Sequence, residues 1–168
     1  HILRIGIKTH EGERKDSVLT FVIDTSGSMS RDNRLGLVKK SLRHLVENLR
    51  EEDKVAIIRY SNSAELILEH TNDKDSILGA LSELKPTGST NAEEGLTMGY
   101  KHAMDEYEDG KNNRVILLSD GVANVGRTGP KVILNQLKTY KEKGIGLTAI
   151  GVGMGNYNDV LLEQLADN

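Results

Sequence analysis

Residues 18–30 read VLTFVIDTSGSMS, and this stretch decides the expected fold. The first six residues, VLTFVI, are nearly all apolar, which is typical of a strand that is covered on both faces. Asp24 follows at once, and Ser26 and Ser28 come directly after it. Because buried polar groups require partners, a buried strand that ends in a carboxylate and two hydroxyls indicates more than packing.

Two further segments have the same character of a buried strand, RVILLS at 114–119 and GLTAIGV at 146–152. Helical periodicity lies between the strand segments, and its clearest case is an apolar stripe at steps of three and four. The stripe consists of Leu35, Val38, Leu42, Leu45, Val46 and Leu49. A weaker helical pattern contains Ile133, Leu137 and Tyr140. Strands that alternate with helices predict an α/β domain.

One pair of strands has a different connection. KVAIIRY (54–60) and AELILEH (64–70) are separated only by SNS, which is too short for a parallel crossover. The pair should therefore be a hairpin. We expect an α/β fold that is doubly wound and Rossmann-like, with a mostly parallel sheet, one antiparallel edge strand, and helices on both faces.

Composition excludes several classes of function. The chain has 168 residues, a formal net charge of -3 and no cysteine. Disulfides and thiolate metal sites are therefore excluded, and the charge gives no electrostatic case for nucleic acid. No apolar run approaches the roughly 20 residues that a membrane-spanning helix needs. We expect neither a nucleic-acid partner nor a membrane segment in this chain.

Three polar segments should meet at one end of the sheet. The first contains Asp24, Ser26 and Ser28, the second is TGSTN (87–91) before a predicted helix, and the third is Ser119 and Asp120 after RVILL. Ligands of open parallel sheets bind beyond the carboxyl ends of the strands. Each segment also has a local explanation, since Asp24 fits an Asx turn, and Thr90 or Asn91 fits a capping box with the glutamate three residues on.

Taken together, the three segments favour a divalent cation. The candidate ligands are Asp24, Ser26, Ser28, Thr90 and Asp120. All of them are oxygen donors, which suit Mg²⁺, Mn²⁺ or Ca²⁺, whereas zinc prefers histidine or cysteine and no histidine lies in these segments. The first three alternate along extended chain, so their side chains point the same way.

Charge counting indicates what such a metal would do. Hydroxyls are neutral donors, and a metal that meets an aspartate through water remains electrophilic. A vacant position on that metal would attract a carboxylate from outside, an Asp or Glu of a partner protein. The sequence therefore predicts a divalent-metal-dependent protein-binding module rather than an enzyme.

These residues resemble a known family. DTSGS after a strand, Thr90 in GSTN and Asp120 in LLSDG resemble the metal-ion-dependent adhesion site of von Willebrand factor type A (VWA) domains. All five positions are present in order, and the resemblance covers about residues 16–168. Bacterial members of the family are most similar in two stretches, the N-terminal residues up to and including DTSGSM (24–29), and GSTNAEEGLTMGY (88–100).

The resemblance implies a role for each ligand. Ser26 and Ser28 would bind the metal directly, and Thr90 would do so in some states. Asp24 and Asp120 would bind directly or through water. Members of the family are mostly adhesion or interaction modules, and many coordinate a partner's Glu or Asp. The resemblance also favours an extracytoplasmic or cell-surface location, although no export signal is present in these residues.

The expected organisation has two parts. Residues 1–16 would form an N-terminal extension, with an edge strand at 2–9 and a charged loop at 10–16. Residues 17–168 would form the VWA domain. We expect this domain to be truncated at its C-terminus, because the family's last strand follows the position of the final helical signal, at 158–168.

Two alternative functions stay open. A magnesium-dependent phosphoryl-transfer enzyme would use Asp24 as nucleophile, but position 26 is a serine where such enzymes need an acid, and no lysine lies in the three segments. A nucleotide-binding loop is suggested by GVGMGN (151–156), but it follows the last strand rather than the first.

Overall fold

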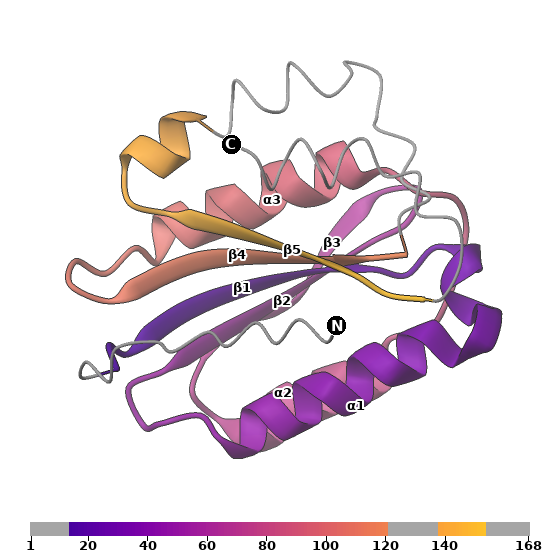
Figure 1. The fold of residues 1–168 in the computed structure, drawn as a ribbon, viewed down its shortest axis with the longest axis horizontal. Helices are drawn as coiled ribbons and strands as arrows, with labels where there is room; N and C mark the ends of the chain where they lie inside the picture. The colour runs from indigo at the N-terminus through magenta and orange to yellow at the C-terminus, as the bar shows by residue number, and fades with distance from the viewer. Residues whose placement is uncertain (1–13, 121–137, 154–168) are drawn as a thin grey trace, which may run out of the picture.

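The computed structural model describes residues 14–120 and 138–153 (Figure 1). In these ranges the chain forms a single sheet with helices on both faces. The elements are β1 (Ser17–Asp24), the 3-10 helix η1 (Gly27–Asn33), α1 (Arg34–Glu47), β2 (Lys54–Tyr60), β3 (Ala64–Thr71), α2 (Lys74–Glu83), α3 (Ala92–Asp105), β4 (Asn112–Ser119) and β5 (Gly146–Gly151).

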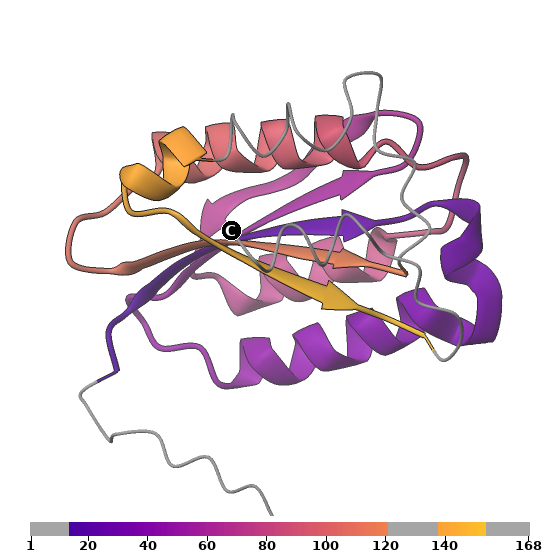
Figure 2. The ribbon, with the colours of Figure 1, turned by 45° about the horizontal axis from the view of Figure 1, so that its top comes forward.

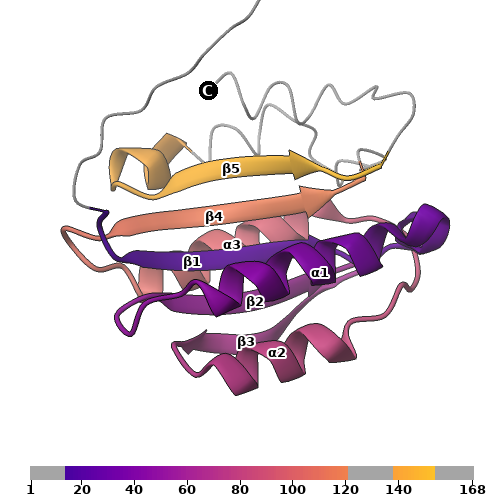
Figure 3. The same cartoon turned by 60° about the horizontal axis from the view of Figure 1, so that its bottom comes forward.

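The sheet has the order β3-β2-β1-β4-β5 (Figure 3). β1 pairs in parallel with both β2 and β4, and β4 pairs in parallel with β5. β2 and β3 are antiparallel, as the short SNS connection requires. The expected fold class is therefore confirmed. Since the connections reverse direction on either side of β1, the carboxyl end of β1 lies at the topological switch point, where ligands of such sheets bind.

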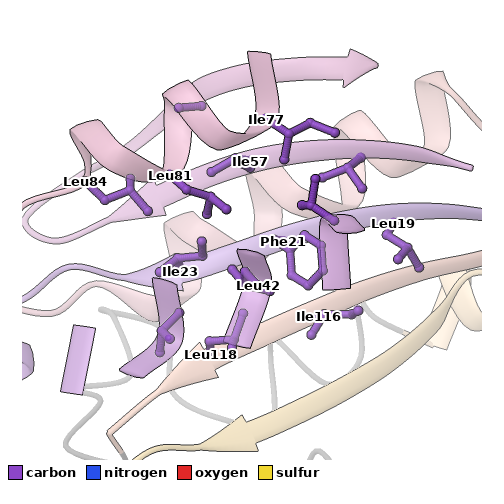
Figure 4. Close-up of a cluster of buried hydrophobic side chains, with 14 of the residues drawn as sticks. Leu19, Phe21, Ile23, Leu42, Ile57, Ile77, Leu81, Leu84, Ile116 and Leu118 are labelled. Carbon is purple, nitrogen blue, oxygen red and sulfur yellow. The ribbon is translucent and has the colours of Figure 1, made fainter. Parts of the chain in front are cut away.

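Alternation along β1 produces two separate cores. α1 and α2 cover one face of the sheet, and α3 covers the other (Figure 2). Leu19, Phe21 and Ile23 point to the first face, where they join Leu42, Ile77 and Leu81 from the two helices (Figure 4). Val22 points to the second face and joins Val115, Leu117, Leu96 and Tyr100. Burial on both faces explains why the strand reads as continuous apolar sequence.

Helix α3 lies very close to the sheet. A Cβ at Gly99 would be 2.5 Å from Val22 Cγ2, and one at Gly95 would be 2.8 Å from Tyr60 Cδ1. The two glycines are four residues apart, so they occupy the same face of the helix. Their missing side chains allow the helix to approach β1 and β2, and the N-terminus of α3 is thereby fixed near the carboxyl ends of both strands.

The helices of the structure agree only in part with those expected from the sequence. The predicted apolar stripe lies on α1 from Leu35 to Val46, and its last member, Leu49, is buried just beyond the end of the helix. The sequence pattern does not predict helix α2. Of the weaker pattern near residue 140, residues 138–142 are helical, and the Tyr140 ring stacks on Tyr100 with centroids 4.9 Å apart. The predicted strand at 2–9 and helix at 158–168 lie outside the described residues. Within the described ranges, no helix has the length and apolar character to cross a membrane.

Candidate metal centre

Asp24 is the last residue of β1 and is completely buried. Parallel registers place it beside Tyr60 at the end of β2 and next to the end of β4. Ser26 donates its backbone N–H to Asp24 Oδ1 at 2.8 Å, and the Ser119 hydroxyl donates to Oδ2 at 3.0 Å. These two hydrogen bonds therefore fix the orientation of the Asp24 carboxylate.

The two serines of the first segment lie together. Ser26 Oγ is 3.0 Å from Ser28 Oγ, and Ser26 is buried. The backbone turns here into η1, where Met29 donates its N–H to the Ser26 carbonyl at 3.0 Å and buries its side chain completely. The Asx-turn explanation is thus also correct, because the bond from Ser26 to Asp24 is such a turn. The same turn that bonds Ser26 to Asp24 also brings the Ser26 and Ser28 hydroxyls together.

The second segment is joined to the first through the backbone. Gly27 donates its N–H to the Gly88 carbonyl at 3.0 Å, and Thr87 donates to the Thr25 carbonyl at 2.6 Å. Gly88 has φ +62°, a conformation that favours glycine. Thr90 itself is half-buried in this segment, and the bonds that join the segments are made by the neighbouring backbone rather than by its hydroxyl.

The end of this segment also caps α3. Asn91 is the N-cap residue, and its side chain accepts a hydrogen bond from the Glu94 N–H. Asn91 is therefore an N-cap, but the capping box is incomplete, because the Asn91 backbone N–H donates to the Ser61 carbonyl and the Glu94 carboxylate accepts from the Asn91 side chain instead. Thr90 lies immediately outside the helix.

Asp120 directly follows β4, and its side chain is fully buried. Its Oδ2 accepts a hydrogen bond from Arg34 Nη1 at 2.6 Å, from the first residue of α1. Arg34 is not among the site residues that the sequence predicts. The two residues are 86 positions apart, and no local pattern signals the pairing.

The carboxylates influence each other and their surroundings. Burial raises the pKa of Asp24, and the charge of Asp120 adds to this effect, while hydrogen bonds from Ser26 and Ser119 act in the opposite direction. Burial also raises the pKa of Tyr60 well above its ordinary value, and the charge of Asp24 contributes. A cation at this end of the sheet would relieve the electrostatic cost of holding Asp24 ionised.

The donor set fits a hard divalent cation. The structure brings Asp24, Ser26, Ser28 and Asp120 to one end of the sheet. Thr90 lies on a loop whose backbone is hydrogen-bonded to Thr25 and Gly27 of the first segment. Within residues 14–120 and 138–153, no three histidine, aspartate or glutamate side chains form a metal-binding cluster. A cation here would therefore depend on the hydroxyl oxygens, which suits Mg²⁺, Mn²⁺ or Ca²⁺.

Comparison with known proteins identifies the family. The sequence model of the von Willebrand factor type A domain matches residues 19–168. The chain belongs to the VWA family. It is 40% identical to the uncharacterized protein YfbK of Escherichia coli (strain K12) over an alignment of 171 residues. This alignment covers 99% of the present chain and 30% of YfbK. This VWA chain spans 30% and 39% of the length of the first two curated relatives, and 17–18% of the inter-alpha-trypsin inhibitor heavy chains that it also matches.

Solved structures share the fold of this VWA domain. BatB from Bacteroides thetaiotaomicron has a TM-score of 0.73 and 21% identity, over 90% of this chain and 85% of BatB. The manganese-loaded TRAP protein of Plasmodium vivax has a TM-score of 0.73 and 23% identity, over 92% of this chain and 63% of TRAP. VWA domains are typically non-enzymatic modules of protein–protein interaction, and they commonly bind a divalent metal.

Proposed function

We propose that this VWA domain is a metal-dependent protein-binding module with a metal-ion-dependent adhesion site. Asp24, Ser26, Ser28, Thr90 and Asp120 would hold one Mg²⁺, or Mn²⁺ or Ca²⁺ in its place. The metal would supply an electrophilic position for a carboxylate of an Asp or Glu on the partner. The observation that carries the proposal is the convergence of two buried carboxylates and two adjacent hydroxyls at the switch point of the sheet.

The residues of the site favour this function over the phosphoryl-transfer alternative. Enzymes of that class need a second acid two residues after the nucleophilic aspartate and are helped by a lysine near the site, and no lysine lies in the three polar segments. Serine at position 26 offers no second acid. The manganese in the TRAP relative gives additional support for a metal-binding role.

Calorimetry with Mg²⁺ and Mn²⁺ tests the proposal directly. The wild-type chain should bind one ion, and Asp24→Ala should abolish binding because it removes a buried ligand. Asp109→Ala is the control, since Asp109 is exposed in the turn after α3 and should leave binding unchanged. Metal binding by Asp24→Ala equal to that of the wild type would refute the proposed site.

Partner binding gives a second test. Binding to any protein partner should be lost in EDTA and return with Mg²⁺ or Mn²⁺, because the proposed contact is the metal itself. Binding should also weaken at low pH, where the partner carboxylate becomes protonated. A complex that persists in chelator would show that the metal is not the contact.

A further inference from the structure

The ion pair between Arg34 and Asp120 differs from the surface salt bridges of this domain. Its hydrogen bond is 2.6 Å long, the Asp120 side chain is fully buried, and the Arg34 side chain is only 15% exposed. A buried pair of this kind interacts strongly, because little water screens the charges. The positive charge of Arg34 is therefore a fixed part of the candidate metal centre.

The surrounding backbone is shaped to hold the guanidinium group. Asp32 and Asn33 both adopt left-handed conformations, with φ of 48° and 55°, which redirect the chain into α1 just before Arg34. On the other side, Gly153 has φ +124°, and a Cβ at this position would lie 3.0 Å from Arg34 Nε. The left-handed residues Asp32 and Asn33, together with Gly153, thus allow the guanidinium group of Arg34 to lie against Asp120.

Charge counting with Arg34 included gives a different result from the ligands alone. Asp24 and Asp120 would neutralise a divalent ion completely, but Arg34 already compensates Asp120. Asp32, the second carboxylate near Arg34 at 3.9 Å, is 80% exposed, so solvent screens its charge. We infer that Arg34 keeps the metal-loaded site positively charged, at the expense of metal affinity, so that the site binds one carboxylate of the partner. This inference rests on the proposed function and adds a specificity-determining residue to it.

The inference predicts opposite effects on two equilibria. Loss of the guanidinium charge removes repulsion of the incoming metal, so Mn²⁺ should bind more tightly. The same loss removes attraction for an incoming carboxylate, so the loaded site should bind acetate more weakly. If Arg34 only holds Asp120 in place, its removal would instead loosen a ligand and weaken metal binding.

The experiment uses the full chain and two variants. Arg34→Gln removes the charge, and Arg34→Met removes it while keeping an unbranched stem that packs, so that one variant remains if the other fails to fold. Mn²⁺ affinity is measured by calorimetry, and acetate affinity of the Mn²⁺-loaded protein by water-proton relaxation. The matched control is Arg31→Gln, which removes the same charge from an exposed position in η1.

We expect the Mn²⁺ dissociation constant to fall about tenfold or more in both Arg34 variants, and the acetate dissociation constant to rise about tenfold. Arg31→Gln should change each constant less than about threefold, since surface charges are screened. Equal or weaker Mn²⁺ binding in the Arg34 variants would overturn the inference and leave the metal site standing. Absence of Mn²⁺ binding in the wild type would instead overturn the proposed function.

Discussion

The Ser119 hydroxyl donates a hydrogen bond to Asp24 Oδ2 over 3.0 Å and joins the carboxyl ends of β4 and β1, 95 residues apart. Ser119 is buried at the last position of its strand, so its hydroxyl has little freedom to turn elsewhere. One oxygen of Asp24 is thereby directed by β4 and the other by the turn at Ser26. The orientation of the carboxylate therefore depends on the pairing of β1 with β4.

Ser119→Ala should lower Mg²⁺ affinity by about tenfold, because a ligand that loses its supporting hydrogen bond is less well oriented. Calorimetry with Mg²⁺ measures the change. Ser63→Ala removes an exposed hydroxyl from the β2–β3 turn and serves as the control. Unchanged affinity in Ser119→Ala would mean that the bond to Asp24 has no role in metal binding.

Gly99→Ala should lower the free energy of unfolding by about 1–3 kcal/mol, because the added methyl group would overlap Val22 Cγ2 at 2.5 Å and force α3 away from the sheet. Gly79→Ala is the matched control. Gly79 lies within α2 with no atom near its hypothetical Cβ, so alanine there should raise stability by about 0.5–1 kcal/mol. Urea denaturation of both variants distinguishes the two effects, and a stabilised Gly99→Ala would contradict the close packing.

The architecture was predictable because strong local patterns specify it. Apolar runs such as VLTFVI identify parallel strands, and the three-residue SNS connection allows only a hairpin. Asp24, Ser26 and Ser28 could be placed because they stand at and just beyond the end of such a strand. Their convergence with Asp120 could be predicted because carboxyl ends of parallel strands share one edge of the sheet.

Other features had no local signal. Helix α2 was missed because its segment, KDSILGALSE, is short and only Ile77, Ala80 and Leu81 are buried. Arg34 has the sequence environment of any basic residue at the start of a helix, and only the fold brings it to Asp120. Asp53 likewise looks like an ordinary loop acid but is fully buried. Contacts between distant residues depend on tertiary packing, which a single sequence does not display.

Asp53 joins the start of β1 to the loop between α1 and β2. Its Oδ1 accepts a hydrogen bond from the Ser17 N–H at 2.7 Å, and its Oδ2 accepts from the Arg50 N–H at 2.9 Å and from Arg14 Nη2 at 2.7 Å. Asp53→Ala should destabilise the domain by about 2–4 kcal/mol, because the buried Ser17 amide and the part-buried Arg50 amide would lose their partner. Thermal unfolding with exposed Asp109→Ala as control measures this effect. A loss below about 0.5 kcal/mol would show that water replaces the carboxylate without cost.

His70 lies on the α3 side of the sheet, with Nε2 3.0 Å from Thr20 Oγ1. Burial lowers the pKa of His70 to about 4, and the charges of His102 and Lys54 act in the same direction. Glu106 and Glu108 act against this shift but do not overcome it. The imidazole is consequently neutral in the folded protein at pH values where the unfolded chain is protonated.

Stability should therefore decrease as pH falls from about 6.5 to about 4, since over this range the unfolded chain gains a proton at His70 that the folded chain does not. The contribution of His70 to this loss is up to about 3 kcal/mol, given 1.36 kcal/mol for each pKa unit. Urea denaturation in chelator at pH 7 and pH 4.5 should show a smaller pH effect in His70→Asn than in the wild type. His44→Asn makes the same substitution at an exposed position on α1 and is the matched control. If the stability of His70→Asn and of the wild type depended on pH in the same way, His70 would take up its proton equally in the folded and the unfolded chain, and the prediction would be wrong.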